Sequence, residues 1–176
     1  MALQALELIE ESGDTRNLGR LRHNVANIQL SLRPPDAAGA LETLQRARKE
    51  IDWSTASALD AARVRLGMAI AHELLGQHPE AVAELDASAA VSPVNATALL
   101  ASQAALRGRL AAARGDLDSA RDQYRQGIAI LTGTGADRDA AQLWYELGQI
   151  LHGLGESELA ADAFRRAGAA QGLAAH

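Results

Sequence analysis

The stretch that decides the fold is residues 139–172, DAAQLWYELGQILHGLGESELAADAFRRAGAAQG. Apolar and small side chains recur in each half of it at intervals of three and four residues: Trp144, Leu147, Gly148 and Leu151, then Ala160, Phe164 and Ala167. Residues at these intervals share one face of an α-helix. Because large and small side chains alternate on the two faces, the stretch predicts two short helices that pack closely across a tight turn.

Features of this stretch recur along the chain. The turn glycines Gly76, Gly115 and Gly155 are 39 and 40 residues apart, and an alanine follows each of them five residues later. A further alanine, Ala40, precedes Ala81 by 41 residues. A helix pair that can bury its apolar stripe only against a neighbouring pair stacks into an array, so this period predicts a helical repeat protein.

The expected fold class is all-α: an α-solenoid, wound as a right-handed superhelix, of about four helix pairs and a leading half repeat. The expected boundaries in this single array are a half repeat over 1–14 and full repeats over 15–53, 54–94, 95–134 and 135–176. Helices are expected over 2–12, 15–33, 37–51, 58–75, 97–114 and 118–131, and another helix has Pro79 in its first turn. Residues 52–55 and 132–135 are expected to be linkers.

Several residues mark the expected helix starts and faces. Asp36 can cap the helix that follows it, and Ser57 begins a capping box. Either Asn95 or Thr97 is expected to cap the helix over 97–114. The helix over 15–33 is expected to have the apolar stripe Leu18, Leu21, Val25, Ile28 and Leu32.

Composition narrows the class of protein. Of the 176 residues, 48% are hydrophobic but only 3% are aromatic, which favours closely packed helices over a β-sandwich or barrel. The net charge is −5 and no long Lys/Arg cluster exists, so direct contact with nucleic acid is not expected. The chain has no cysteine, no run of 18 apolar residues and no signal-peptide pattern, so we expect a cytoplasmic protein that does not contact the membrane.

On these residues the chain resembles tetratricopeptide repeat (TPR) proteins over nearly its whole length. The motif positions in the last repeat are Trp144, Leu147, Gly148, Gly155, Ala160, Phe164 and Ala167. Segments 5–36 and 131–167 resemble the C-terminal TPR region of bacterial, actinobacterial-type helix-turn-helix transcriptional regulators, in which the DNA-binding part precedes the array. Arg107 and Arg114 stand where the motif has apolar residues, so the register of the third repeat is left open.

In a TPR array the first helix of each pair lines a concave groove, and the motif register implies which side chains face it. The candidates for binding a ligand or peptide are Arg20, His23, Asn27, Arg63, Ile70, Arg109, Gln142, Tyr145, Gln149 and His152. Leu30, Leu66, Glu73, Ser102 and Ala105 are expected on the same face. Amide side chains can pair with a peptide backbone and arginines can hold a carboxylate. The alternative interpretation is that this polar face is only solvated.

No catalytic residue, metal site or cofactor is expected. His72 is followed by Glu73, but Gly76 stands where the zinc motif H-E-x-x-H requires a second histidine. The Gly-rich residues 132–135 lack the preceding strand and the following Gly-Lys-Ser/Thr of a phosphate loop.

Two functional hypotheses remain. The first is a non-enzymatic interaction module, the sensor or partner-binding part of a cytoplasmic regulator, which takes a peptide, a protein segment or a small signal molecule into its groove. The second is a constitutive scaffold or homodimerisation platform without a ligand switch, because the Ala/Gly-rich C-terminus and the unpaired first helix favour self-association.

Overall fold

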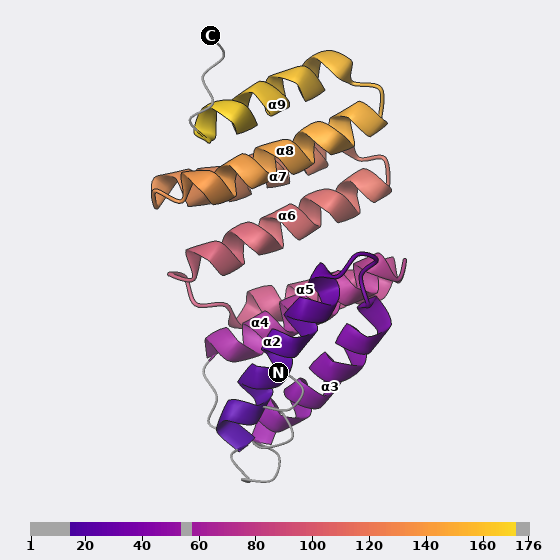
Figure 1. The fold of residues 1–176 in the computed structure, drawn as a ribbon, viewed down its shortest axis with the longest axis vertical. Coiled ribbons are helices and arrows are strands. Elements are labelled where there is room, and N and C mark those ends of the chain that lie inside the picture. Colours follow the sequence, from indigo (N-terminus) through magenta and orange to yellow (C-terminus); the bar gives the residue numbers. More distant parts are fainter. Residues whose placement is uncertain (1–14, 54–57, 172–176) are drawn as a thin grey trace. The chain divides into compact units, whose positions relative to one another are not determined.

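The computed structural model describes residues 15–53 and 58–171, which form eight α-helices and no strand (Figure 1). The helices are α2 (Thr15–Ser31), α3 (Ala37–Trp53), α4 (Ala58–Leu74), α5 (His78–Val91), α6 (Thr97–Ala113), α7 (Leu117–Gly133), α8 (Asp137–Gly153) and α9 (Ser157–Ala170). The predicted helix over 2–12, the half repeat over 1–14 and the capping box at Ser57 lie outside the described residues.

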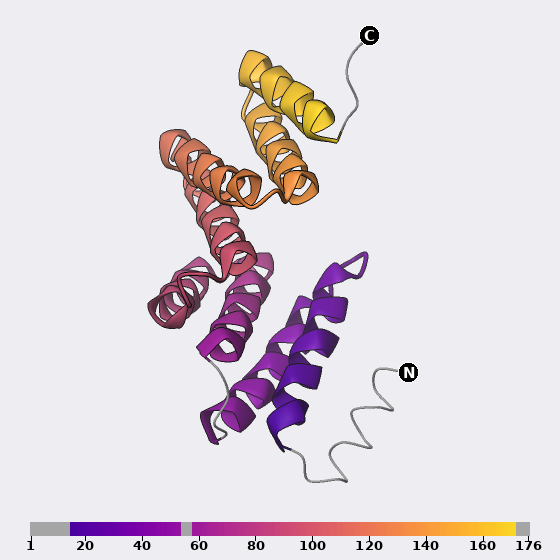
Figure 2. The ribbon, with the colours of Figure 1, turned by 90° about the vertical axis from the view of Figure 1, so that its left-hand side faces the viewer.

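The chain divides into two compact units. The N-terminal unit, Met1–Pro93, contains α2 to α5, and the C-terminal unit, Val94–His176, contains α6 to α9. Consecutive helices form hairpin pairs within each unit, α2 with α3 and α4 with α5, then α6 with α7 and α8 with α9 (Figure 2).

The core of the N-terminal unit lies between α2, α3 and α4. Its buried members are Ala26, Ala40, Leu44, Ala47, Ile51, Val64 and Met68. Leu44 is fully buried. A Cβ placed on Gly67 of α4 would lie 3.1 Å from both terminal carbons of Leu44, so the two helices approach closely at this glycine. Small residues therefore allow a large side chain to fill the seam.

The core of the C-terminal unit follows the predicted alternation of large and small residues. Tyr124 of α7 is fully buried and packs against Gly108 of α6, where an added Cβ would lie 2.6 Å from the tyrosine ring. Phe164 of α9 packs in the same way against Gly148 of α8, also at 2.6 Å. These two seams are separated by 40 residues and confirm that the large residue of each second helix fits over a glycine of the first.

The turns inside the α4/α5, α6/α7 and α8/α9 pairs use a glycine with a left-handed backbone. Gly115 and Gly155 have φ of 79° and 83°, which residues with a Cβ rarely adopt. The amide of Asp116 donates to the carbonyl of Ala111 at 3.0 Å, and the amide of Glu156 donates to Leu151 at 2.9 Å. The same six-residue hydrogen bond closes each helix end, so the repeated glycines predicted these turns correctly.

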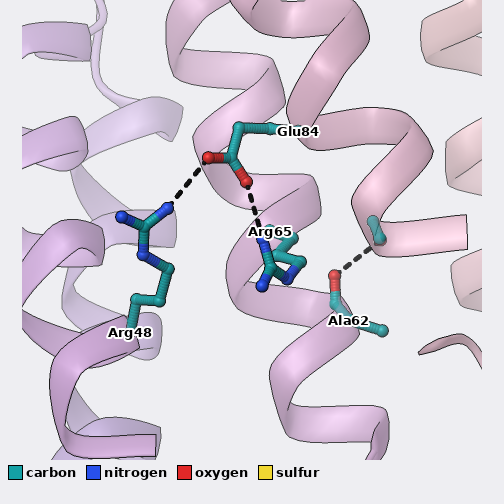
Figure 3. A network of polar contacts seen from close by, with 5 residues as sticks. Arg48, Ala62, Arg65 and Glu84 are labelled. Atoms are coloured by element: carbon teal, nitrogen blue, oxygen red, sulfur yellow. Dashed lines mark hydrogen bonds and ion pairs between the residues drawn. The ribbon is translucent and has the colours of Figure 1, made fainter. Parts of the chain in front are cut away.

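A shared carboxylate joins α3, α4 and α5 (Figure 3). One oxygen of Glu84 accepts from Arg48 Nη1 at 3.0 Å and the other lies 3.4 Å from Arg65 Nη1. One turn further along α5, the hydroxyl of Ser88 donates to the carbonyl of Ala62 on α4 at 2.7 Å. These contacts hold one face of α5 against α3 and α4.

Some predicted helix ends were wrong by one or two residues. Asp36 does cap α3, since one of its oxygens accepts from the amide of Gly39 at 3.0 Å. In contrast, neither Asn95 nor Thr97 caps α6: its first flanking residue is Ala96, whose short side chain makes no cap hydrogen bond. The first two residues of each expected linker are helical, because α3 continues to Trp53 and α7 continues to Gly133.

The apolar stripe predicted for α2 is only partly buried. Leu18 and Val25 lie in the core, but Ile28 and Leu32 are 52% and 48% exposed. Leu32 follows the last residue of α2, and an α-helical face drifts relative to a strict seven-residue repeat. The distal part of the predicted stripe therefore turns away from α3.

Candidate binding surfaces

The ten predicted groove residues divide equally between the two units. The N-terminal unit holds Arg20, His23, Asn27, Arg63 and Ile70, and the C-terminal unit holds Arg109, Gln142, Tyr145, Gln149 and His152. All ten come from first helices of helix pairs, namely α2, α4, α6 and α8. We therefore describe one candidate surface in each unit.

In the N-terminal unit, three predicted residues line a cavity of about 340 Å³. This α2/α4 cavity is lined by Gly19, Arg20, His23, Asn24, Ile51, Asp60, Arg63 and Val64. Arg20 and His23 lie one turn apart on α2, and Arg63 comes from the first turns of α4. The structure thus brings together side chains that are about 40 positions apart in the sequence.

Asp60 is the centre of charge in the α2/α4 cavity. Its side chain is only 12% exposed, and its two oxygens lie 3.2 Å from Arg20 Nε and 3.9 Å from Arg63 Nη1. The two arginine side chains remain 59% and 48% exposed. A guanidinium has five N–H donors, so contact with one carboxylate saturates neither arginine. Two positive charges facing one negative charge leave the cavity with a positive excess.

The imidazole of His23 is half-buried in the same cavity. Burial lowers the pKa of His23 below its ordinary value of 6.5, and the positive charge of Arg63 lowers this pKa further. A hydrogen bond with Asn24 and the negative charge of Asp60 act in the opposite direction. Because the net pKa shift is downward, the ring is mainly neutral at pH 7 and can donate one hydrogen bond and accept another.

The other predicted residues of this unit lie outside the cavity lining. Asn27 is exposed one turn after His23, and its amide nitrogen lies 3.4 and 3.5 Å from the two ring nitrogens. Ile70 is half-buried on α4. Leu66 was expected in the groove but is only 7% exposed, because its face of α4 is packed in the interior.

In the C-terminal unit, Glu146 gathers the polar side chains of α6, α7 and α8. Its oxygens lie 3.8 Å from Arg109 Nη1 and 3.2 Å from Gln142 Nε2, and the hydroxyl of Tyr124 is 3.4 Å away. Two of these partners were predicted groove residues, but Glu146 was not. Ala105, expected on the same face, is buried at 3% exposure under α8.

Tyr145 lies in a second cavity, of about 570 Å³, between α8 and α9. This α8/α9 cavity is lined by Gln142, Tyr145, Phe164, Ala167, Gly168 and Gln171. The tyrosine side chain is 46% exposed and its ring centroid lies 5.5 Å from that of Phe164. Gln149 and His152 continue along the same helix as exposed residues outside the cavity lining.

Four residues at these candidate surfaces were not among the predicted groove residues: Asp60, Asn24, Glu146 and Phe164. Asp60 stands three residues before Arg63 and was interpreted only as part of a capping box. Glu146 is the next residue after Tyr145. The motif register assigns position 145 to the groove but does not assign position 146. Asp60 could have been found from the sequence, because it is three residues before Arg63 and carries the opposite charge, and such pairs are neighbours on a helix.

Trp144 departs from its predicted environment. The motif implied a buried packing residue, but the indole is half-buried against the core and Arg166 lies over its ring at 5.0 Å from the centroid. A cavity of about 360 Å³ beside it is lined by Arg121, Arg125, Leu159, Asp162 and other residues of α7 to α9. The tryptophan therefore packs on one side and meets a cation on the other.

Metal-binding clusters and membrane-spanning helices are both absent from the part of the chain that the structure describes. No group of three or more His, Asp or Glu side chains there is placed to hold a metal ion. No described helix combines the length and the apolar character that crossing a membrane requires.

The comparisons with known proteins agree with this architecture. Residues 141–167, which comprise most of α8 and α9, match the family model described as tetratricopeptide repeat. No curated protein matches the sequence. The crystal structure of BtubC (BKLC) from P. vanneervenii is similar over 95% of this chain and 77% of that chain, with 17% identity and a TM-score of 0.62. The crystal structure of MamA is similar over 96% of this chain and 86% of that chain, with 17% identity and a TM-score of 0.57.

The family model and the structural neighbours together assign the fold. The matched residues hold the glycine turn at Gly155 and the seam between Gly148 and Phe164. The likeness to the two crystal structures extends over nearly the whole chain and concerns the fold alone. Residues 141–167 are a tetratricopeptide repeat, and the predicted all-α solenoid class is confirmed.

Proposed function

We propose that the chain is a non-enzymatic interaction module and that its α2/α4 cavity binds an acidic segment of a peptide or partner protein. The observation that carries this proposal is the arrangement of Arg20 and Arg63 around Asp60. One buried carboxylate holds two half-exposed guanidinium groups at the mouth of a cavity. The arginines are therefore oriented before a ligand arrives, which reduces the entropy lost on binding.

The charge of the cavity selects the chemistry of the ligand. With Asp60 neutralising one arginine, a carboxylate from the ligand would neutralise the other and form charge-assisted hydrogen bonds with it. Arginine suits this role because its planar group can donate two parallel hydrogen bonds to one carboxylate. Asn24 and the neutral ring of His23 line the same cavity and can pair with the backbone amides beside an acidic side chain.

His23 makes the proposed binding depend on pH. A carboxylate bound near the ring would oppose the effect of Arg63 and favour the protonated imidazole. By linkage, the ligand then binds more tightly when the ring can take up a proton. We therefore expect the affinity for an acidic peptide to rise as the pH falls below 6.5, the ordinary pKa of histidine.

A finer proposal concerns the biological setting. The resemblance of segments 5–36 and 131–167 to bacterial regulators supports a role as the sensor part of a cytoplasmic transcriptional regulator. Binding of a peptide, a protein segment or a small signal would then shift the population of two packings and bias an attached DNA-binding part. Deleting residues 15–171 from the parent regulator should abolish its response to inducing conditions, and an intact response would contradict this role.

The experiment for the cavity begins with a selection of random 12-residue peptides displayed on phage against the full chain. We expect enrichment of Asp- or Glu-containing peptides. The best binder is then titrated by calorimetry into the wild-type protein and into the double variant Arg20→Gln/Arg63→Gln. Loss of two charge-assisted contacts should weaken binding by about tenfold or more.

The matched control is Arg46→Gln. Arg46 is an exposed arginine of the same unit that forms an ion pair with Glu42 on α3, and it does not line the cavity. Its variant should bind the peptide as the wild-type protein does. Enrichment of peptides without acidic residues, or equal affinity of the double variant, would contradict the proposed function.

A further inference from the structure

The α8/α9 cavity has an internal counterpart one repeat earlier. Its six lining residues are Gln142, Tyr145, Phe164, Ala167, Gly168 and Gln171. Subtracting 40 from each number gives Ser102, Ala105, Tyr124, Gly127, Ile128 and Leu131, which are on α6 and α7. The α8/α9 cavity therefore lies where these six counterparts lie on the surface of α6 and α7.

That earlier surface is an interface for a helix. Ala105, Tyr124, Ile128 and Leu131 form one buried cluster with Ala140, Leu143, Leu147 and Leu151 of α8. An added Cβ on Gly127 would lie 3.0 Å from Leu143 Cδ1, so the leucine presses against the backbone of α7. The four apolar residues of the surface are at most 6% exposed as a result.

The corresponding surface of α8 and α9 is open. Tyr145, the counterpart of Ala105, is 46% exposed, whereas Ala105 is 3% exposed. Gly168 replaces Ile128, and the missing side chain contributes to a cavity of about 570 Å³. Ala167 and Phe164 keep the apolar floor. Among the described helices, none covers this surface as α8 covers its counterpart.

We propose that the α8/α9 cavity receives a helix of a partner protein whose uncharged apolar stripe has the spacing of Ala140, Leu143 and Leu147. The lining carries no charged side chain, so a charge in the stripe would be buried without a partner. Gln142 and Gln171 contribute amides to the lining and can pair with polar groups flanking the stripe.

A second copy of the chain does not supply such a stripe from its described helices. The stripe residues of three first helices are already buried or half-buried in their own unit: Leu18, Leu21 and Val25 in α2, Val64 and Met68 in α4, and Leu143 and Leu147 in α8. In α6 the corresponding positions hold Gln103 and Arg107, which are polar. This distribution favours a different protein as the source of the helix.

The probe for this surface is a fluorescein-labelled peptide with the sequence of α8, Asp137–Gly153, because that sequence already fits the counterpart surface. Its fluorescence anisotropy is measured with the full chain. We expect saturable binding, and loss of binding when the peptide carries Leu143→Asp and Leu147→Asp. No saturable binding of the unmodified peptide, or equal binding of the substituted peptide, would overturn the proposal.

Two variants of the protein locate the binding. Gly168→Arg places a long charged side chain in the cavity and should weaken binding by about tenfold or more. Ala169→Arg is the matched control, since Ala169 is an exposed neighbour on α9 that does not line the cavity. Gln171→Arg, at an exposed position, repeats the test without altering the core. Equal weakening by the control, or no weakening by Gly168→Arg and Gln171→Arg, would overturn the location.

Two further measurements test what occupies this surface and whether it binds independently of the α2/α4 cavity. Light scattering of the wild-type protein should show no dimer that Gly168→Arg dissociates, and such a dimer would identify a second copy as the occupant and overturn the proposal. The variant Arg20→Gln/Arg63→Gln should still bind the α8 peptide, because those arginines belong to the N-terminal unit. Loss of binding in that variant would contradict an independent site on α8 and α9.

Discussion

The ring of Tyr145 on α8 lies against the ring of Phe164 on α9, with centroids 5.5 Å apart and planes tilted by 53°. The same phenylalanine also packs on Gly148 of α8. Tyr145 was predicted from sequence as a groove residue, and the structure places it at the wall of the α8/α9 cavity. One aromatic pair therefore links the packing of the last described helix pair to a candidate binding surface.

Removal of the tyrosine ring should affect binding more than stability. Tyr145→Ala is expected to lower the free energy of unfolding by about 1 kcal/mol, the usual contribution of an exposed aromatic pair. It should also weaken binding of the α8 peptide, while Tyr145→Phe keeps both properties. Urea unfolding and anisotropy measure the two effects. A loss of stability of about 3 kcal/mol or more would show that Tyr145 is a core residue.

The substitution Gly148→Ala should destabilise the protein. Alanine normally stabilises a helix interior relative to glycine by about 1 kcal/mol. At Gly148, however, the added Cβ would lie 2.6 Å from Phe164, and such overpacking costs about 1–3 kcal/mol. Gly153→Ala, on the same helix with no atom within 4 Å, should be neutral or stabilising. Thermal unfolding of both variants gives the comparison, and equal effects would contradict the close seam.

The stability of the N-terminal unit should depend on the protonation of His23. Because the pKa of His23 is lowered in the folded state, the unfolded chain binds the proton more tightly. The contribution of His23 to stability is therefore fully present above 6.5 and is lost as the pH falls through 6.5 toward the lower folded pKa. His23→Gln should reduce the difference in unfolding free energy between pH 7.5 and pH 5.5. An unchanged or larger difference would contradict the downward pKa shift.

The shared carboxylate of Glu84 should matter more than an exposed ion pair. The Glu84 side chain is 17% exposed and contacts both Arg48 and Arg65. In the variant Glu84→Gln, these two arginines would face each other without a counter-charge. We expect Glu84→Gln to lower the free energy of unfolding by about 1 kcal/mol. Glu42→Gln breaks an exposed ion pair and should leave the free energy of unfolding nearly unchanged. Chemical denaturation in low and high salt tests both variants. A larger loss for Glu42→Gln would reverse this ranking.

The sequence was sufficient to predict the elements that depend on local spacing. The turn glycines, the seam of Gly148 with Phe164 and the cap at Asp36 each follow from residues within about 16 positions of one another. Their geometry is set by helix periodicity and by the backbone angles that only glycine adopts readily. The all-α repeat class follows from these local features together with their recurrence about every 40 residues.

The groove was predicted less completely because its chemistry depends on pairs from different helices. Arg20 and Arg63 were chosen by register, but the register does not reveal that Asp60 lies between them. Leu66 and Ala105 occupy equivalent motif positions to Tyr145 and are nevertheless buried, since the neighbouring helices cover them. Side-chain exposure at one motif position thus differs from repeat to repeat.

The most direct test of the central claim is to map the binding of the selected acidic peptide by amide chemical-shift changes in the ¹⁵N-labelled full chain. The claim predicts that the largest changes cluster on α2 and the first turns of α4, at Arg20, His23 and Arg63, and that they disappear in Arg20→Gln/Arg63→Gln. Changes centred on the outer helices α3 and α5, with none at these three residues, would contradict it.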